Sequence, residues 1–223
     1  IINVKDSTFF TTIIYIFLIY SYNIPLIIWK KKNSIQTLKD EIHNLKYVIN
    51  ILEKNNFSKT NNFQKLCKIS LKAIKNNKKI IFFGNGGSAA DSQHLATELT
   101  IKYKKKRKAL PAIALSTDNS AITAAGNDFG FKFIFSRQLE AIGNPGDIVV
   151  ALTTSGNSQN LIEACKVANK KKIFTTCLSG NNGGRLKRFT KLPIIIPSKN
   201  TSIIQIIELL LGQVLCGYLE ENA

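Results

Sequence analysis

A histidine and a glutamate four residues apart, just beyond a glycine-rich turn, are the residues of this chain best suited to chemistry. His94 and Glu98 are predicted to share one helix face, because side chains at positions i and i+4 lie on the same side. The turn before them, GNGGS at residues 84–88, follows an apolar run at 80–83. Glycines let the backbone approach an anion, and the free N–H groups at a helix start attract phosphate. The segment therefore predicts a phosphate-binding turn beside a group that can transfer protons.

A second loop with phosphate-binding chemistry comes later in the chain. The sequence TTSGNS at residues 153–158 directly follows an apolar run at 148–152 and opens a predicted helix. Its hydroxyl side chains and free N–H groups can hold a phosphate without a lysine. One such turn is more often a simple helix cap, but two of them after strands of one sheet favour an anion site. A third polar segment, GNDFG at residues 126–130, is predicted to be a loop at the same edge.

The elements that must position these loops form the pattern of one doubly wound α/β domain. Helical spacing predicts two N-terminal helices, over 34–55 and 62–76. Apolar runs then alternate with helical stretches, which indicates a parallel five-stranded sheet covered on both faces. In such a sheet ligands bind at the carboxyl ends of the strands, near the switch point. The predicted strands are 80–83, 112–115, 148–152, 173–178 and 193–196, and the later helices are 89–102, 132–142, 157–170 and 202–219.

The composition of the chain indicates which kinds of molecule it is expected to bind. The 223 residues carry 31 Lys and Arg against 14 Asp and Glu, a net charge of +17. The basic run at 102–108 suggests nucleic acid, but lysine is frequent throughout the chain, so a nucleic acid is not the expected partner. A basic surface also attracts a small phosphorylated sugar. Four widely spaced cysteines in apolar contexts indicate reduced core residues of a cytoplasmic protein: Cys67, Cys165, Cys177 and Cys216.

Residues 7–29 carry no charge and are followed by three lysines. The length suffices for a membrane span, and the lysines would leave the following domain in the cytoplasm. Three interpretations compete: a signal anchor, the apolar first helix of an oligomer, or upstream sequence outside the functional protein. Asn23 and Pro25 interrupt the stretch, which counts against a signal anchor, and we favour the last interpretation. The globular domain is then expected to span 33–223, with 1–32 as an apolar segment of doubtful status.

On these residues the chain resembles the SIS (sugar isomerase) domain family and, within it, the phosphoheptose isomerases. The resemblance runs from about residue 33 to residue 220 and implies a flavodoxin-like fold. It also implies a homotetramer with active sites at subunit contacts. The implied reaction converts sedoheptulose 7-phosphate to D-glycero-D-manno-heptose 7-phosphate through an enediol, for lipopolysaccharide precursors. Five ordered segments carry the match: GNGGSAADSQHLATEL (84–99), LPAIALSTD (110–118), GNDFGF (126–131), FSRQLEAIGNPGD (135–147) and TSGNS (154–158).

The resemblance also implies roles for particular residues. Glu98 falls on the catalytic base, and Gln213 falls where the family has a second catalytic histidine. A zinc ion is implied at four positions: His94, Glu98, Gln205 and Gln213. Substrate contacts are implied at Asn85, Gly86, Gly87, Ser88, Glu98, Asn127, Asp128, Thr153, Thr154, Ser155, Ser158 and Gln205.

The last predicted helix departs most from the family. Gln213 replaces the histidine, Ile203 replaces an arginine, and Glu208 replaces another histidine. Glutamine offers a neutral carbonyl ligand but cannot carry protons near pH 7, so slower turnover and weaker zinc binding are expected. Glu208, one turn from Gln205, is expected on a similar face, where it could offer a carboxylate. The other histidine, His43, is expected to have a surface role.

Two kinds of function follow. The first is an active phosphoheptose isomerase, favoured by the retained His94 and Glu98. The alternative is a catalytically impaired SIS protein, favoured by the altered last helix. Such a protein would act as a sugar-phosphate sensor, or as a binding partner of a replication initiator.

Overall fold

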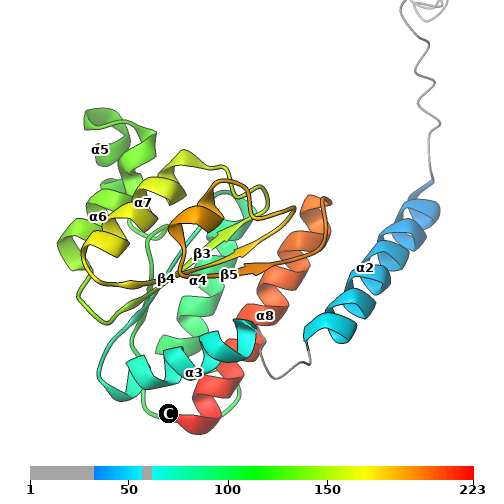
Figure 1. Ribbon diagram of the computed structural model, residues 1–223, viewed down its shortest axis with the longest axis horizontal. Coiled ribbons are helices and arrows are strands. Elements are labelled where there is room, and N and C mark those ends of the chain that lie inside the picture. Colours follow the sequence, from blue (N-terminus) through cyan, green and yellow to red (C-terminus); the bar gives the residue numbers. More distant parts are fainter. Residues whose placement is uncertain (1–32, 57–61) are drawn as a thin grey trace, which may run out of the picture. The chain divides into compact units, whose positions relative to one another are not determined.

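The computed structural model of the protein describes residues 33–56 and 62–223 (Figure 1). The apolar stretch at 7–29 lies outside the described residues, so the interpretation of this stretch as an anchor stays a prediction. The chain divides into two units between Asp40 and Glu41. In the first, Asn33 starts helix α2 (Ser34–Asn56) by accepting a hydrogen bond from the Gln36 N–H at 2.7 Å. The second unit contains the sheet and every residue discussed below.

The sheet has five parallel strands in the order β2-β1-β3-β4-β5. From β1 the chain continues to β2 on one side of the sheet, and from β3 it continues to β4 and β5 on the other side. The neighbouring strands β1 and β3 therefore mark the switch point of a doubly wound fold. The predicted fold class is therefore confirmed. The strands are β1 (Ile80–Phe83), β2 (Ala112–Ala114), β3 (Ile148–Thr153), β4 (Phe174–Ser179) and β5 (Leu192–Ile195).

Helices cover both faces of this sheet, because its strands are apolar on both sides. In β1, Ile80 and Phe82 pack into one core cluster and Ile81 and Phe83 into the other, and all four are fully buried. Figure 1 shows the two helical layers on either side of the strands. One layer holds α3 (Asn62–Lys75), α4 (Gly87–Thr100) and α8 (Thr201–Asn222), and the other holds α5 (Asn119–Asp128), α6 (Ile134–Ile142) and α7 (Gln159–Lys170).

Helix α8 is a core helix that packs closely on α4. A Cβ atom at Gly212 would lie 2.3 Å from Cδ1 of the fully buried Leu95, so a glycine is needed at this crossing. In the described part of the chain, α8 alone is long and apolar enough to cross a membrane, by length and composition. Its buried side chains, which include Leu215 and Leu219, lie instead in the core of the domain.

Helix α8 also holds the basic run at 102–108. Glu220 accepts hydrogen bonds from the backbone N–H groups of Tyr103, Lys104 and Lys105 at 3.0, 2.7 and 3.0 Å. Nε of Arg107 lies 3.1 Å from the same carboxylate. This run is therefore a folded loop tied to the C-terminal helix.

The predicted loop at 126–130 is wrong for its first three residues, which form the end of α5 (Asn119–Asp128). This helix begins at Asn119, where the Asp118 side chain caps it by accepting the Ala121 N–H at 2.9 Å. Two short 3-10 helices also complete the fold, η1 (Phe131–Phe133) and η2 (Leu186–Phe189). The prediction that the cysteines are core residues is confirmed, since Cys67, Cys165, Cys177 and Cys216 are buried.

Candidate active site

The two predicted anion loops lie side by side at the switch point. Residues 84–88 leave the end of β1, and residues 153–158 begin at the end of β3. These strands are hydrogen-bonded neighbours, with Phe83 opposite Ala151. The sequence expectation that both loops share one edge of the sheet is therefore confirmed.

The glycine loop at 84–88 is tied to both α7 and α8. Gly86 has φ 55°, a left-handed conformation that suits glycine, and it opens α4. A Cβ atom at Gly87 would lie 2.4 Å from Nε2 of Gln205, so the Gln205 side chain lies directly on this glycine. Asn85 and Asn160 exchange two side-chain hydrogen bonds, at 3.0 and 2.8 Å. The loop is therefore fixed from two sides.

Three of the predicted catalytic and metal residues meet where α4 and α8 cross. Nε2 of His94 lies 2.8 Å from Oε1 of Glu98, and the side chains are 44% and 19% exposed. Nε2 of Gln213 lies 3.4 Å from Nε2 of His94, a weaker contact. Gln205 lies about two turns earlier in α8, against the glycine loop. His43, the other histidine, is exposed on α2, as expected.

The donor chemistry of this group bears on the implied zinc ion. A catalytic zinc ion usually has three protein ligands drawn from His, Glu, Asp and Cys. Here His94 and Glu98 are the strong donors, and Gln205 and Gln213 offer only neutral amide oxygens. Over residues 33–56 and 62–223, no three His, Cys, Asp or Glu side chains are grouped to hold a metal ion. The residues present do not fit a zinc site of the usual kind, and no step below passes through a metal.

The hydroxyl loop at 153–158 is organised by its own side chains. Thr153 Oγ1 accepts the Gly156 N–H at 3.2 Å, and Ser155 Oγ accepts the Asn157 N–H at 3.2 Å. Ser158 precedes α7 but makes no side-chain cap. Its hydroxyl group and the N–H groups at the start of α7 are therefore available to an anion.

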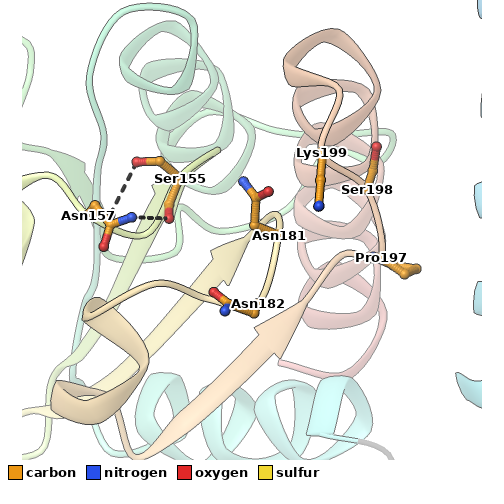
Figure 2. A pocket seen from close by; sticks show the side chains of 7 residues that line it. All are labelled: Ser155, Asn157, Asn181, Asn182, Pro197, Ser198 and Lys199. Carbon is orange, nitrogen blue, oxygen red and sulfur yellow. Dashed lines mark hydrogen bonds between the residues drawn. The ribbon is translucent and has the colours of Figure 1, made fainter.

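A polar cavity of about 580 Å³ lies at the carboxyl ends of β3, β4 and β5. Figure 2 shows Asn181 between Ser155 and Lys199. Of the predicted substrate residues only Ser155 lines this cavity, so it extends the hydroxyl loop toward β5 and does not include the His94–Glu98 pair. The lining residues are Ser155, Asn157, Asn181, Asn182, Pro197, Ser198 and Lys199.

Two predicted substrate residues stand apart from this arrangement. Asn127 and Asp128 are exposed at the end of α5, and the Asn127 side chain donates to Oδ1 of Asp128 at 2.8 Å. Among residues 33–56 and 62–223, the side chains of Asn127 and Asp128 hydrogen-bond only to each other. The single chain therefore does not bring them into hydrogen-bonding contact with Glu98 or with either loop.

Glu208 lies on a similar face of α8 to Gln205, as expected, since Gln205 lies against Gly87 and Glu208 contacts the adjacent Ser88. The expectation of an available carboxylate is wrong, because the Glu208 side chain is fully buried and faces the two loops. Oε2 accepts the Ser88 hydroxyl at 3.0 Å, and Oε1 accepts the Thr153 N–H at 2.9 Å. A buried acid in an apolar helix was the available signal, because such a group needs partners.

The environment of Glu208 shifts its ionisation. Burial raises the pKa of Glu208 to about 8, although the hydrogen bonds from Ser88 and Thr153 lower it, and the nearby Asp91 raises it further. Burial also raises the pKa of Asp91, while the charge of His94 lowers it. A second carboxyl group therefore lies close to Glu208 beneath the site.

Fold and site together define the class of this protein, a SIS domain. The SIS domain family model matches residues 43–180. The structure of a phosphoheptose isomerase from Neisseria gonorrhoeae superposes with a TM-score of 0.77 at 34% identity, covering 85% of this chain and 100% of that one. A phosphoheptose isomerase from Francisella tularensis superposes with a TM-score of 0.79 at 30% identity, with the same coverage.

Proteins of similar sequence identify one family among the SIS-domain proteins. The phosphoheptose isomerase of Nitratiruptor sp. is 46% identical over 154 residues, which cover 69% of this chain and 82% of that protein. That of Aquifex aeolicus is 49% identical over 149 residues, covering 67% and 78%. The chain belongs to the phosphoheptose isomerase family of SIS-domain proteins.

Proposed function

We propose that this chain interconverts sedoheptulose 7-phosphate and D-glycero-D-manno-heptose 7-phosphate, in the synthesis of heptose for lipopolysaccharide. Its relatives named phosphoheptose isomerase support the reaction class. The observation that carries the proposal is the His94–Glu98 pair, whose Nε2 and Oε1 atoms are 2.8 Å apart beyond the glycine loop. A carboxylate beside a phosphate-binding edge is what an aldose–ketose isomerase requires.

Glu98 is the proposed base. It removes a proton from C1 of the ketose and returns it to C2 of the enediol, while a proton passes from the C1 hydroxyl to the C2 oxygen. The reaction is therefore balanced without an outside oxidant or reductant. His94 orients the carboxylate through their hydrogen bond. A positioned base of this kind contributes roughly 10² to 10⁴ in rate.

The amide side chains of Gln205 and Gln213 are proposed to act at the substrate oxygens. An amide N–H can stabilise negative charge that develops on the enediol oxygens. It cannot carry a proton between them near pH 7. This division of roles predicts an active but slow enzyme, because Gln213 gives polarisation without proton transfer.

The phosphate is proposed to lie on the hydroxyl loop. Ser158 supplies a hydroxyl group that makes no cap, and α7 supplies the N–H groups of its first two residues, while the N–H of Leu161 donates to Asn160 Oδ1. The proposed substrate contacts are those expected from the family: Asn85, Gly86, Gly87, Ser88, Glu98, Asn127, Asp128, Thr153, Thr154, Ser155, Ser158 and Gln205. Asn127 and Asp128 stand apart in one chain, and a subunit contact is where we expect them to serve.

The working molecule is proposed to be a cytoplasmic homotetramer built from the domain at 33–223. Four buried, free thiols suit a reducing compartment. An exposed apolar stripe on α8, formed by Ile206, Leu210 and Val214, supports self-association. Zinc at His94, Glu98, Gln205 and Gln213 is expected to be weakly held at best.

A direct assay tests this proposal. Conversion of sedoheptulose 7-phosphate is measured for the wild-type chain and for Glu98→Gln, with Glu140→Gln as the matched control. Glu140 is exposed on α6, and its carboxylate pairs with Arg137 on the same helix. We expect Glu98→Gln to lose roughly 10² or more in kcat and Glu140→Gln to keep wild-type activity. Equal turnover in wild type and Glu98→Gln would remove Glu98 from the mechanism.

The alternative is a sugar-phosphate sensor, and the observation in its favour is Gln213. A sensor would bind sedoheptulose 7-phosphate and melt at a higher temperature in its presence, yet show no conversion. A partner-binding SIS protein would show neither response. The same two measurements therefore separate all three functions.

A further inference from the structure

We propose that Glu208 is a positioning residue that fixes the glycine loop and the hydroxyl loop at their working distance. The inference deepens the proposed function, because these loops are the ones assigned to the sugar phosphate. It concerns a fully buried residue that reaches both loops. The family resemblance implies a histidine at this position, so the bridge is inferred from the contacts of this chain alone.

The geometry makes Glu208 a bridge. One carboxyl oxygen accepts the hydroxyl group of Ser88, at the end of the glycine loop, at 3.0 Å. The other accepts the backbone N–H of Thr153, at the start of the hydroxyl loop, at 2.9 Å. The three groups are 0%, 3% and 5% exposed, so water cannot replace either bond. A planar carboxyl group spanning two neighbouring strand ends sets the spacing between them.

The two groups that donate hydrogen bonds to Glu208 belong to residues whose other polar atoms are already hydrogen-bonded. Thr153 Oγ1 already accepts the Gly156 N–H, so the first residue of the hydroxyl loop is held at its amide by Glu208 and at its hydroxyl by the loop itself. The Ser88 carbonyl accepts Ser92 Oγ at 2.7 Å within α4. A buried N–H or O–H that loses its acceptor costs roughly 1–3 kcal/mol. Both loop ends would therefore shift if the carboxyl group were removed.

The reaction depends on the distance between the glycine loop and the hydroxyl loop. The phosphate is assigned to the hydroxyl loop, and the reacting carbons to the region beyond the glycine loop. The spacing of the loops then decides whether a sugar phosphate held at one end presents C1 and C2 to Glu98 at the other. Small misplacements of this kind are costly, since about 1 Å can reduce rates roughly 10²-fold.

Substrate binding is the readout that tests this role. Calorimetry with sedoheptulose 7-phosphate gives Kd for wild type, Glu208→Leu and Glu208→Gln. Leucine keeps most of the side-chain volume but accepts no hydrogen bond. Glutamine keeps an oxygen for the Thr153 N–H and offers an N–H to the Ser88 hydroxyl. We expect Kd to rise about tenfold or more in Glu208→Leu and to stay within about twofold in Glu208→Gln.

Glu220 provides the matched control on the same helix. It too is buried and accepts backbone N–H groups, but from residues 103–105, away from both loops. Glu220→Leu should lower the melting temperature without changing Kd. Amide hydrogen exchange adds a second, reciprocal readout. Exchange should quicken at residues 153–158 in Glu208→Leu and at residues 103–105 in Glu220→Leu.

The outcomes separate this inference from the proposed function. Unchanged Kd and exchange in Glu208→Leu would overturn the positioning role and leave turnover as evidence for the isomerase. A wild-type protein that binds but does not convert sugar phosphate would overturn the isomerase and leave the bridge testable by Kd. Should Glu208→Leu not fold, Glu208→Asp is the substitute. Its shorter side chain cannot reach both loops, so the same rise in Kd is expected.

Discussion

Gln213 decides whether a second proton carrier stands beside Glu98. Its amide lies 3.4 Å from Nε2 of His94, where an imidazole would add both a titratable group and a third strong metal donor. We therefore expect Gln213→His to raise kcat about tenfold or more. We also expect it to bind zinc measurably more tightly than wild type. Steady-state kinetics with and without zinc, together with zinc calorimetry, test both effects.

Lys170→His is the control for an added histidine. Lys170 is exposed at the end of α7, at the opposite edge of the sheet from the two loops, so its replacement should change neither kcat nor zinc affinity. Equal kinetics in Gln213→His and wild type would show that no second proton carrier limits the reaction. In that case proton transfer between the substrate oxygens does not need an ionisable side chain at position 213.

Glu208 should make stability depend on pH. Its pKa rises from the ordinary 4.5 to about 8 in the folded protein, so the folded state binds more protons than the unfolded state between these values. The free energy of unfolding should fall as pH rises across this window, by at most about 5 kcal/mol. Glu208→Gln cannot ionise and should lack this fall. Urea unfolding at about pH 5 and about pH 9 measures it, and parallel pH profiles for the two proteins would contradict the assignment.

At the scale of elements, Gly212 sets how closely α8 approaches α4. Because its Cβ would lie 2.3 Å from Leu95 Cδ1, Gly212→Ala must push the helices apart or displace a fully buried leucine. We expect a loss of about 1–3 kcal/mol in the free energy of unfolding, measured by urea titration. Activity should also fall, since Gln213 would move away from His94.

Gly126 offers the matched glycine. It lies within α5, and the nearest atom to its Cβ would be Ile134 Cγ2 at 4.0 Å. Gly126→Ala should therefore stabilise the protein by about 0.5–1 kcal/mol through helix propensity. If both alanine variants changed stability alike, close packing at Gly212 would not be the reason for its glycine.

The elements also show how far sequence reasoning reaches. The five strands were predictable because each is a short apolar run bounded by polar turns, as at residues 80–83. Helix α5 was missed because Gly126, Asn127 and Asp128 read as turn residues, while the cap at Asp118 that starts the helix is a side-chain contact. The bridge by Glu208 was also beyond prediction, since it depends on where α8 lies over two loops.

At the scale of the molecule, the site exists only because the sheet order brings distant segments together. The sequence patterns at residues 84–88 and 153–158 each predict an anion-binding loop. Their contact requires β1 and β3 to be neighbours, and α8 then adds residues 205–213 from the end of the chain. Local patterns predict the loops, and only the tertiary structure places Gln205, Glu208 and Gln213 around them.

Self-association is the last prediction, and it concerns the outer face of α8. Ile206, Leu210 and Val214 are spaced by four residues and are 47%, 46% and 48% exposed, which makes one apolar stripe. The stripe adjoins an apolar groove of about 440 Å³ that is lined partly by Leu52 and Phe63. A patch of this kind is what a second copy of the chain would cover.

Leu210→Glu should therefore break the proposed homotetramer into smaller species, because an interfacial charge without a partner is costly to bury. Light scattering coupled to size-exclusion chromatography measures the mass. Ile101→Glu, which changes an exposed apolar residue just after α4, should leave it unchanged. Val214 follows Gln213 directly, so loss of the assembly should also lower activity. A wild-type chain that runs as a monomer, with Leu210→Glu fully active, would show that α8 completes the site without a second copy.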